Sequence, residues 1–311
     1  MLPHTASAAP RVHTRTGVRR ASARLHSWDL AHCLGRGAFA EVFAARPTGA
    51  SNQAAQPPSQ YDYAIKVLRH PLCNDATARA AFRNEAVLGR TISHPHLVPI
   101  LSADTQSKTP FLVMPNLRGA TLSDALSQHG AISVAHSLWI VRQLAEALAA
   151  VHDAGWIHGD VKSANVMIAA DGHVTLFDLG FANAIERGQP NLPRVLRGTL
   201  GYLAPELLTS RTCIAGASDV YGLGITLFEM LTGRLPFDSE SDERLAESHV
   251  REMPPSPRHF VPSLPRELAH LVTRMLAKSP DRRPSADELI SLFTGLEIEF
   301  FALRGYNSAN T

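Results

Sequence analysis

The sequence predicts an α+β protein with two lobes: a small β-rich lobe over residues 27–114 and a larger α-helical lobe over residues 119–296. In the first part, short apolar runs alternate with turn residues, which is typical of strands, and one helix is expected over residues 76–88. In the second part, apolar residues recur at helical spacing over longer segments. The pattern changes at residues 115–118, which we expect to connect the lobes as a hinge.

The overall composition is that of an ordinary globular protein. The chain is 45% hydrophobic and 19% charged, so it can bury a core of normal size. Its formal net charge of +2 is too small to indicate a nucleic-acid partner, and none is expected. No apolar run approaches the roughly 18 residues that a membrane span needs, so no span is expected.

The cysteines indicate the compartment. Cys33, Cys73 and Cys213 are scattered and have no Cys-x-x-Cys spacing, so neither a disulfide framework nor a zinc site is predicted. Disulfides are rare where thiols are kept reduced, and we therefore expect a cytoplasmic protein.

The two ends of the chain differ from the rest. Residues 1–26 are rich in arginine and contain no acidic residue, which predicts a disordered basic tail. Mitochondrial and plastid transit peptides share this bias, so organellar targeting is the alternative. Residues 297–311 are expected to form a short C-terminal extension that packs on the larger lobe.

The first chemical signal is a glycine loop. Gly35 and Gly37 lie between two strand-like runs, and glycines there let the backbone approach phosphate groups closely. Taken alone, such a pair usually marks a simple hairpin turn. Residues 46–60, rich in Pro, Gly, Ser and Gln, are predicted to be an exposed loop to the next strand.

A lysine and a glutamate follow this loop. The next strand-like run contains Lys66, and Glu85 comes nineteen residues later in the predicted helix. A single Lys–Glu pair is normally an exposed ion pair on the protein surface with no functional role. Together with the glycine loop, however, the two residues are what a phosphate-binding lysine held by a helix carboxylate requires.

Two helices are expected to form the core of the larger lobe. Residues 134–152 place Leu138, Val141, Leu144 and other apolar side chains on one face. Residues 219–232 are nearly all apolar, which predicts a helix that is buried on every side.

Between these helices lies the main polar constellation. A His-Gly-Asp triplet ends at Asp160, and an Asp-Leu-Gly triplet begins at Asp178. Phosphoryl transfer needs a carboxylate to orient the attacking hydroxyl, oxygen ligands for magnesium, and cations around the phosphoryl group. Asp160 can supply the first, and Asn165 and Asp178 the second. Lys66 and Lys162 can supply the cations. Each aspartate alone could be a turn former or helix cap, but the ordered set points to one site.

Taken together, these motifs resemble those of the eukaryotic-type (Hanks-type) serine/threonine protein kinase family, over residues 28 to about 294. The resemblance implies a bilobal protein-kinase-like fold. It also implies ATP and Mg²⁺ as cofactors, with Mn²⁺ as an alternative ion, and protein substrates with serine or threonine acceptors. No regulatory partner can be identified from the sequence.

The resemblance also assigns a role to each matched residue. The catalytic set would be Asp160 as the base, with Lys162, Lys66 and Glu85. The magnesium ligands would be Asn165 and Asp178. The nucleotide would contact Gly35, Arg36, Gly37, Val42, Ala64, Lys66, Met114, Pro115, Leu117, Asn165 and Asp178.

Motifs beyond the chemical site indicate the class of substrate. Ala204-Pro205-Glu206 resembles the end of an activation segment, with Arg283 as the expected partner of Glu206. Asp219 is expected to hold the backbone of the catalytic loop. Small-molecule kinases that share the fold generally lack this segment and its arginine, so a protein substrate is favoured. Lys162, two residues after Asp160, is the serine/threonine form.

Three positions depart from the family pattern. Ala40 replaces a loop glycine and Leu179 replaces a phenylalanine, and we expect both changes to be tolerated. Gly159 stands where most of the family has an arginine that receives a phosphate on the activation loop, which makes this an HGD (non-RD) variant. Residues 181–197 contain no Ser, Thr or Tyr, so the phosphate acceptor is missing as well. We therefore predict that activation-loop phosphorylation does not control the protein.

Two other functions compete with this interpretation. A pseudokinase scaffold would bind partners or nucleotide without catalysis, and it would be expected to have lost Lys66, Asp160 or Asp178. All three are present. A small-molecule phosphotransferase is disfavoured by the activation-segment motif and Arg283.

Overall fold

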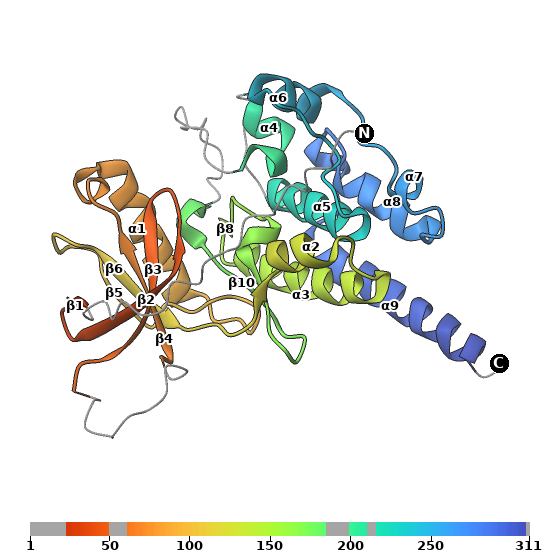
Figure 1. Cartoon of the computed structure of the whole chain (residues 1–311). Coiled ribbons are helices and arrows are strands. Elements are labelled where there is room, and N and C mark those ends of the chain that lie inside the picture. The colour runs from red at the N-terminus through yellow and green to blue at the C-terminus, as the bar shows by residue number, and fades with distance from the viewer. Residues whose placement is uncertain (1–22, 50–60, 185–198, 210–215, 309–311) are drawn as a thin grey trace, which may run out of the picture.

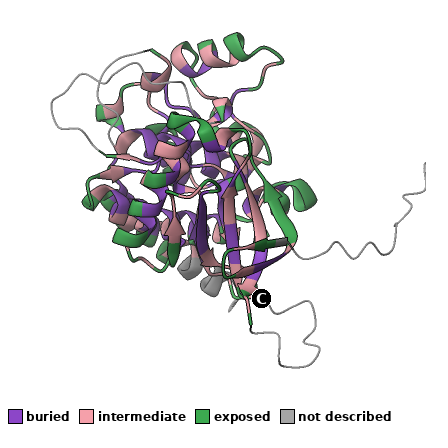
Figure 2. Cartoon of the chain, turned by 90° about the vertical axis from the view of Figure 1, so that its left-hand side faces the viewer, coloured by how far each residue is buried: buried purple, intermediate pink, exposed green. Residues whose placement is uncertain are grey.

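The computed structural model describes residues 23–49, 61–184, 199–209 and 216–308. The β-rich lobe and the helical lobe lie next to each other, and the chain passes from one to the other after β6 (Figure 1). The predicted α+β architecture with two lobes is confirmed. Buried residues fill the inside of both lobes, and exposed residues cover the outer faces (Figure 2).

The small lobe is built on one antiparallel sheet in the order β1-β2-β3-β4-β6-β5. Its strands are β1 (Ala23–Leu25), β2 (Trp28–Arg36), β3 (Ala40–Pro47), β4 (Tyr63–Leu68), β5 (Ser102–Asp104) and β6 (Phe111–Pro115).

The alternation of side chains along β4 determines where Lys66 points. Ile65 packs in the cluster on one face of the sheet, whereas Leu68 packs with Phe82 on the other. Successive side chains of a strand point to opposite faces, so Lys66 shares the face of Leu68. That face is covered by α1 (Ala76–Thr91), the helix predicted over residues 76–88.

Helix α1 is fixed at both ends. The side chain of Asp75 accepts a hydrogen bond from Ala78 N, which caps the N-terminus. Near the other end, Gly89 lies against Ile100, and a Cβ at this position would collide with the Ile100 side chain. The close approach brings the apolar face of α1 onto the sheet and turns Glu85 toward Lys66.

Helices dominate the larger lobe. They are α2 (Leu122–His129), α3 (Val134–Asp153), α4 (Pro205–Leu208), α5 (Gly216–Thr232), α6 (Asp242–Arg251), α7 (Pro257–Phe260), α8 (Arg266–Met275) and α9 (Ala286–Ser308). Helix α5 runs through the core and is buried along most of its length, so the prediction for residues 219–232 is confirmed. Helix α3 covers the predicted residues 134–152 and packs along α9.

Short strands carry the chemical segments. β9 (Val166–Ile168) lies between β10 (Val174–Leu176) and β7 (Ala120–Thr121), and β8 (Trp156–Ile157) pairs with β11 (Asn183–Ala184). The residues that follow β8 and β10 are the two aspartate triplets found in the sequence. The small sheets therefore present both triplets at strand ends.

Two elements lie at the predicted ends of the domain. β1 begins at Ala23, four residues before the predicted start at residue 27, and forms a hairpin with β2 in which Leu25 pairs with Trp28. Helix α9 spans the boundary predicted after residue 296 and continues to Ser308. Most of the predicted basic tail and most of the loop predicted over residues 46–60 lie outside the described residues.

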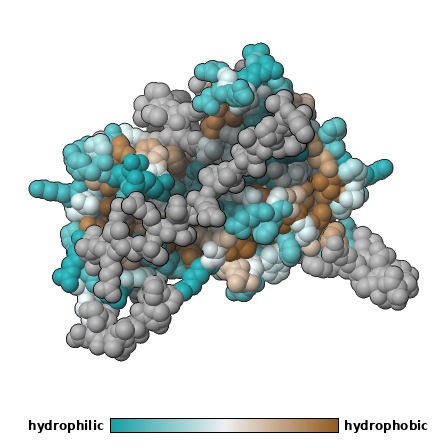
Figure 3. Space-filling view, viewed as in Figure 1, coloured by the Kyte–Doolittle hydropathy of each residue, from teal (hydrophilic) through white to brown (hydrophobic). Residues whose placement is uncertain are grey.

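The surface seen in Figure 3 mixes hydrophilic and apolar residues over both lobes, and α6 at the top is strongly hydrophilic. Within the described ranges, no helix has both the length and the apolar character needed to cross a membrane.

Candidate active site

Lys66 lies at the centre of a three-residue ion cluster. Its Nζ is 2.7 Å from both carboxylate oxygens of Glu85 and 2.7 Å from Oδ1 of Asp178. β4 supplies the lysine, α1 supplies Glu85, and the segment after β10 supplies Asp178. The structure therefore brings together three residues that the sequence assigned to one site, from both lobes.

Burial and charge act in opposite directions on this cluster. Burial by itself lowers the pKa of the Lys66 amine, but the carboxylates of Asp178 and Glu85 outweigh it and raise that pKa, so Lys66 is a cation. Burial raises the pKa of Glu85 to about 7, against the opposing effect of Lys66. Burial would also raise the pKa of Asp178, yet the Lys66 ammonium lowers it below its usual range.

Asp178 has an unusual backbone conformation. Its φ of 69° lies in the left-handed region, which non-glycine residues seldom adopt. Gly180 lies close to the carboxylates of both Asp178 and Glu85. A Cβ at this position would be 3.2 Å from Asp178 Oδ1 and 3.3 Å from Glu85 Oε2. The glycine leaves room for the two carboxylates to converge on Lys66.

A second cluster surrounds Asp160. Its Oδ2 is 2.6 Å from Lys162 Nζ and accepts a 2.9 Å hydrogen bond from Asn165 Nδ2. Its Oδ1 accepts a bond from the backbone N–H of Thr199 at 3.3 Å. Lys162 also donates to the Thr199 hydroxyl at 2.6 Å. Asp160, Lys162 and Asn165, all predicted site residues, are thus brought together, and both carboxylate oxygens of Asp160 are held.

The backbone next to Asp160 is fixed by Asp219 at the start of α5. Asp219 accepts hydrogen bonds from the N–H groups of His158 and Gly159, both at 2.8 Å. His152 Nε2 lies 2.8 Å from the same carboxylate. Burial would raise the pKa of Asp219, but the contact with His152 lowers it. The buried carboxylate is therefore fully paired, as a buried charge must be.

Gly159 makes a contact that a larger residue could not make. Its φ of 81° is a conformation that favours glycine, and a Cβ there would lie 2.6 Å from the carbonyl oxygen of Phe181. Phe181 ends the short helix Leu179–Phe181 that follows Asp178. The catalytic loop and the segment after Asp178 therefore touch backbone to backbone at Gly159.

The glycine loop closes the hairpin between β2 and β3. Gly35 pairs with Val42, and the N–H of Gly37 donates to the carbonyl of Ala40 at 2.9 Å. The Arg36 side chain forms an ion pair with Glu41 at 2.8 Å across the hairpin. Its guanidinium is therefore paired within the hairpin and is not part of the ion cluster around Lys66.

The remaining nucleotide-site residues predicted from the sequence lie on or just after the strands beside Lys66. Ala64 pairs with Met114, and Met114 is half-buried against the cluster under α1. Pro115 pairs with Tyr63, and Leu117 follows in the connection between the lobes, where it is half-buried. These residues therefore lie on β4, on β6 and in the connection between the lobes.

The donor atoms fit a magnesium ion that is coordinated partly by protein oxygen atoms and partly by phosphate oxygen atoms. In the part of the chain that the structure describes, no group of three or more His, Cys, Asp or Glu could hold a metal unaided. Mg²⁺ usually binds one or two carboxylates together with substrate phosphates and water. The Asn165 amide nitrogen donates to Asp160, which leaves its oxygen as the possible ligand. Asp178 supplies a carboxylate.

The activation-segment motif is fixed by a buried ion pair. Arg283 Nη1 lies 2.6 Å from Glu206 Oε1, and Nη2 donates to Glu206 Oε2 at 2.8 Å. The Arg283 side chain is 0% exposed, so this bidentate pair is fully desolvated. The partner expected for Glu206 is thus the one observed.

Several residues of the site were not singled out from the sequence. Thr199 was given no role from the sequence, although it contacts both Asp160 and Lys162. Tyr202 donates to Glu229 at 2.6 Å and lies 3.0 Å from the Ser163 hydroxyl beside the catalytic loop. His152 sits in the last turn of α3, and nothing in its neighbourhood marks it as the partner of Asp219.

Comparison with known proteins agrees with this geometry. The sequence matches the family described as "Protein kinase domain" over residues 28–292. A probable serine/threonine-protein kinase of Streptomyces coelicolor, SCO3848, is 33% identical over 269 residues, which cover 84% of this chain and 38% of the relative. The serine/threonine-protein kinase PrkC of Bacillus subtilis is 30% identical over 257 residues, with 82% and 38% covered.

A third relative is the serine/threonine-protein kinase PknB of Mycobacterium tuberculosis, 34% identical over 264 residues. The match covers 82% of this chain and 40% of the relative. The chain therefore spans about two fifths of the length of these curated relatives.

Proposed function

Because this chain belongs to the protein kinase family, we propose that it transfers the γ-phosphoryl group of ATP to serine or threonine hydroxyls of protein substrates. The observation that carries the proposal is the contact of Lys66 with Glu85 and Asp178 across the lobes. The relatives named as serine/threonine-protein kinases support the choice of acceptor. The activation-segment ion pair between Glu206 and Arg283 supports a protein rather than a small molecule as substrate.

Each residue has a defined task in this proposal. Lys66 binds the α- and β-phosphates, and Glu85 orients it. Asp160 accepts a hydrogen bond from the acceptor hydroxyl and then its proton. Lys162, 2.6 Å from Asp160, places a cation beside the transferring group. Such positioning, rather than covalent chemistry, accounts for most of the catalysis in phosphoryl transfer.

Asp178 and Asn165 would hold the metal ion. When bound, the ion neutralises negative charge on the β- and γ-phosphates. We assign Mg²⁺ in preference to Mn²⁺ because the available donors are hard oxygen atoms and phosphate-bound Mg²⁺ needs few protein ligands. The scattered cysteines support a reducing, cytoplasmic setting for the reaction.

The protein is further proposed to act without activation-loop phosphorylation, as an HGD (non-RD) variant of the family. Gly159 provides no side chain to bind a phosphate, and residues 181–197 provide no Ser, Thr or Tyr to carry one. Most of that segment lies outside the described residues, so the proposal depends on the sequence and on Gly159. Treating active protein with phosphatase should leave its activity unchanged. Loss of activity that is traced by mass spectrometry to a phosphate on Thr199 would contradict the proposal.

The main experiment measures transfer of labelled phosphate from ATP to myelin basic protein in the presence of magnesium. Asp160→Asn should lower the rate roughly 10²–10⁴-fold, because the base and its positioning role are lost together. Asp287→Asn, at an exposed position in the first turn of α9, is the matched control and should keep the parental rate. A wild-type protein that binds nucleotide but transfers nothing would identify a pseudokinase. An Asp160→Asn variant as active as the parent would remove Asp160 from the mechanism.

A further inference from the structure

The hairpin of β9 and β10 connects the two residues that are expected to hold the metal ion. Asn165 directly precedes β9, and Asp178 follows the end of β10 by two residues. Beyond the paired strands, the N–H of Phe177 donates to the carbonyl of Asn165 at 3.0 Å. The position of β10 against β9 therefore sets the distance between the backbones of Asn165 and Asp178.

β10 is an edge strand of its sheet, and the backbone groups that Val174 and Leu176 turn outward are all hydrogen-bonded. The N–H of Leu176 donates to the His96 carbonyl at 2.9 Å, and the Leu176 carbonyl accepts from the N–H of Val98 at 3.1 Å. The Val174 carbonyl lies 2.8 Å from Nδ1 of His96. The N–H of Val174 donates to Oε1 of Gln143 at 3.0 Å. This last bond joins the strand to the core helix α3.

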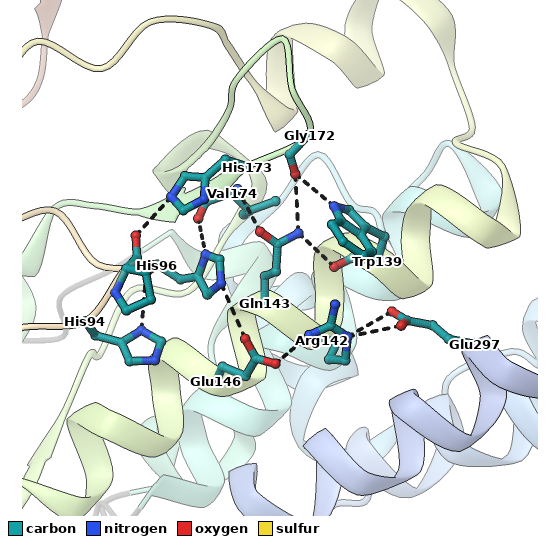
Figure 4. Close-up of polar contacts among 11 residues, drawn as sticks. His94, His96, Trp139, Arg142, Gln143, Glu146, Gly172, His173, Val174 and Glu297 are labelled. Atoms are coloured by element: carbon teal, nitrogen blue, oxygen red, sulfur yellow. Dashed lines mark hydrogen bonds and ion pairs between the residues drawn. The ribbon is translucent and has the colours of Figure 1, made fainter.

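Gln143 uses both ends of its side-chain amide (Figure 4). Besides the bond that Oε1 accepts from Val174, Nε2 donates to the carbonyl of Gly172 at 3.3 Å and to that of Trp139 at 3.2 Å. Gln143 is only 3% exposed. Because a carbonyl oxygen only accepts and a backbone N–H only donates, the amide fits this site in one orientation. Gln143 therefore binds the first residue of β10 and the turn before it.

Trp139 holds the same turn. It lies one helical turn earlier on α3, and its Nε1 donates to the Gly172 carbonyl at 2.9 Å. Gly172 has a φ of 83°, a conformation that favours glycine. We call the side chains of Trp139 and Gln143 the α3 clamp. Since α3 packs along α5 and α9, the clamp ties the hairpin to the core of the larger lobe.

Buried polar groups are normally paired, and a purely structural role would account for the bonds of Gln143 alone. The position of the α3 clamp indicates a second role. β9 and β10 have three residues each, and so short a hairpin is marginally stable by itself. β9 is supported on its other side by β7, whereas β10 depends on the α1–β5 connection and on the α3 clamp.

We propose that Gln143 is a positioning residue that fixes Asp178 relative to Asn165, so that both ligands reach one magnesium ion bound with the nucleotide. It does so by anchoring β10 to α3 through Val174 and Gly172. The metal role of the two ligands rests on the proposed function, but the α3 clamp does not. Mg²⁺ demands near-octahedral geometry at short distances. A small shift of one ligand therefore weakens metal binding more than nucleotide binding.

The first measurement separates metal binding from nucleotide binding. Gln143→Met nearly keeps the volume of the side chain but removes its three hydrogen bonds. Calorimetry should show a Kd for ADP that rises about tenfold in the presence of magnesium and stays the same in excess EDTA. Loss of stability alone would not change one of these Kd values without the other. Gln128→Met, at an exposed position on α2, is the matched control and should behave as the wild type.

Hydrogen exchange tests the α3 clamp without nucleotide. The amides of Leu176 and Phe177 keep their own acceptors in Gln143→Met, so the faster exchange that we expect there reports movement of β10. Trp139→Phe removes one bond of the clamp and should shift both measurements in the same direction by a smaller factor. Val272→Ala, at a buried position on α8, removes core volume elsewhere and should leave the ratio of the two Kd values unchanged.

The outcomes distinguish this proposal from the proposed function. Equal ratios of the two Kd values in the wild type and Gln143→Met, or unchanged exchange of both amides, would overturn the role of Gln143. A wild type whose affinity for ADP does not depend on magnesium would overturn it together with the metal assignment. A wild type that binds ADP more tightly with magnesium yet transfers no phosphate would refute the proposed function alone.

Discussion

The ammonium of Lys66 joins Glu85 of the small lobe to Asp178 of the larger lobe, with all three contacts at 2.7 Å. The lysine is thus held by two carboxylates that compete for it. In the proposed function, Lys66 turns part of its hydrogen bonding toward the phosphates of the nucleotide, and Glu85 keeps the amine in position.

Glu85→Gln should weaken nucleotide binding. The amide carries no charge, so Lys66 is left to pair more strongly with Asp178 and less available to phosphates. We expect the KM for ATP to rise about tenfold, equivalent to about 1.4 kcal/mol. Steady-state kinetics checks this, with Glu267→Gln, an exposed position on α8, as the control. An unchanged KM would show that Glu85 does not orient the lysine.

Replacing Gly159 should impair catalysis as well as stability. Gly159→Ala puts a Cβ against the Phe181 carbonyl and displaces the segment after Asp178. Gly155→Ala is the matched control, because Gly155 has a similar φ of 80° but nothing within 4 Å of its added Cβ. Both variants should lose about 1–2 kcal/mol from backbone strain. Only Gly159→Ala should also lose activity, and equal activities would mean that the Phe181 contact has no role in catalysis.

Arg283→Ala should destabilise the larger lobe severely. Removing one partner of a buried ion pair leaves an unpaired buried charge, here on Glu206, which costs about 3–5 kcal/mol. Urea unfolding measures the loss, and Arg282→Ala, at an exposed neighbouring position, should change little. The double variant Glu206→Ala/Arg283→Ala should lose less than the sum of the single variants. Additive losses would argue against a direct coupling.

The stability of the protein should fall in mild acid because of His249. Burial, followed by the charge of Lys278, lowers the pKa of His249 to about 4, against about 6.5 in an unfolded chain. The unfolded state therefore binds the proton more readily between these values. The free energy of unfolding should fall as pH drops from 6.5 to 4, by up to about 3 kcal/mol.

His249→Gln tests this pH dependence, because its amide can still form a hydrogen bond with the Tyr221 hydroxyl, which lies 3.0 Å from Nδ1 of His249. The slope of unfolding free energy against pH should become shallower in this variant. His259→Gln, an exposed histidine, serves as the control. Equal slopes in the wild type and His249→Gln would exclude His249 as the titrating group.

The sequence revealed the polar constellation because each residue type has a distinct chemical use. Lys66, Glu85, Asp160 and Asp178 are separated widely along the chain, yet their order and flanking strand or helix patterns predicted one site. The short apolar run of β4 was enough to predict a strand, and the longer apolar run of α5 was enough to predict a buried helix. These features depend on local chemistry and periodicity, which a sequence displays directly.

Other parts of the site depend on contacts that local patterns do not encode. The loss of an arginine at Gly159 was visible, but its positive φ and its contact with Phe181 arise only when the two loops are packed together. Nothing in the local sequence distinguishes His152 or Thr199 from other helix and loop residues. Their roles arise because the fold brings Asp219 next to His152 and Asp160 next to Thr199. Strand β1 was not predicted, because its three residues are too few to show an alternation of apolar and polar side chains. The strand is stabilised by its pairing with β2, which is not visible in the local sequence.

The length of α9 has a practical consequence for anyone expressing the protein. The family match stops at residue 292, in the middle of that helix, whereas Leu296 and Phe300 still pack against the main core and Glu297 still pairs with Arg142. A recombinant fragment that ends with the matched region would lack the apolar side chains that α9 packs against α3. The exposed apolar surface of α3 would then promote aggregation. Expression boundaries should therefore fall beyond Phe300, and a poorly behaved shorter fragment would say little about the activity of the intact chain.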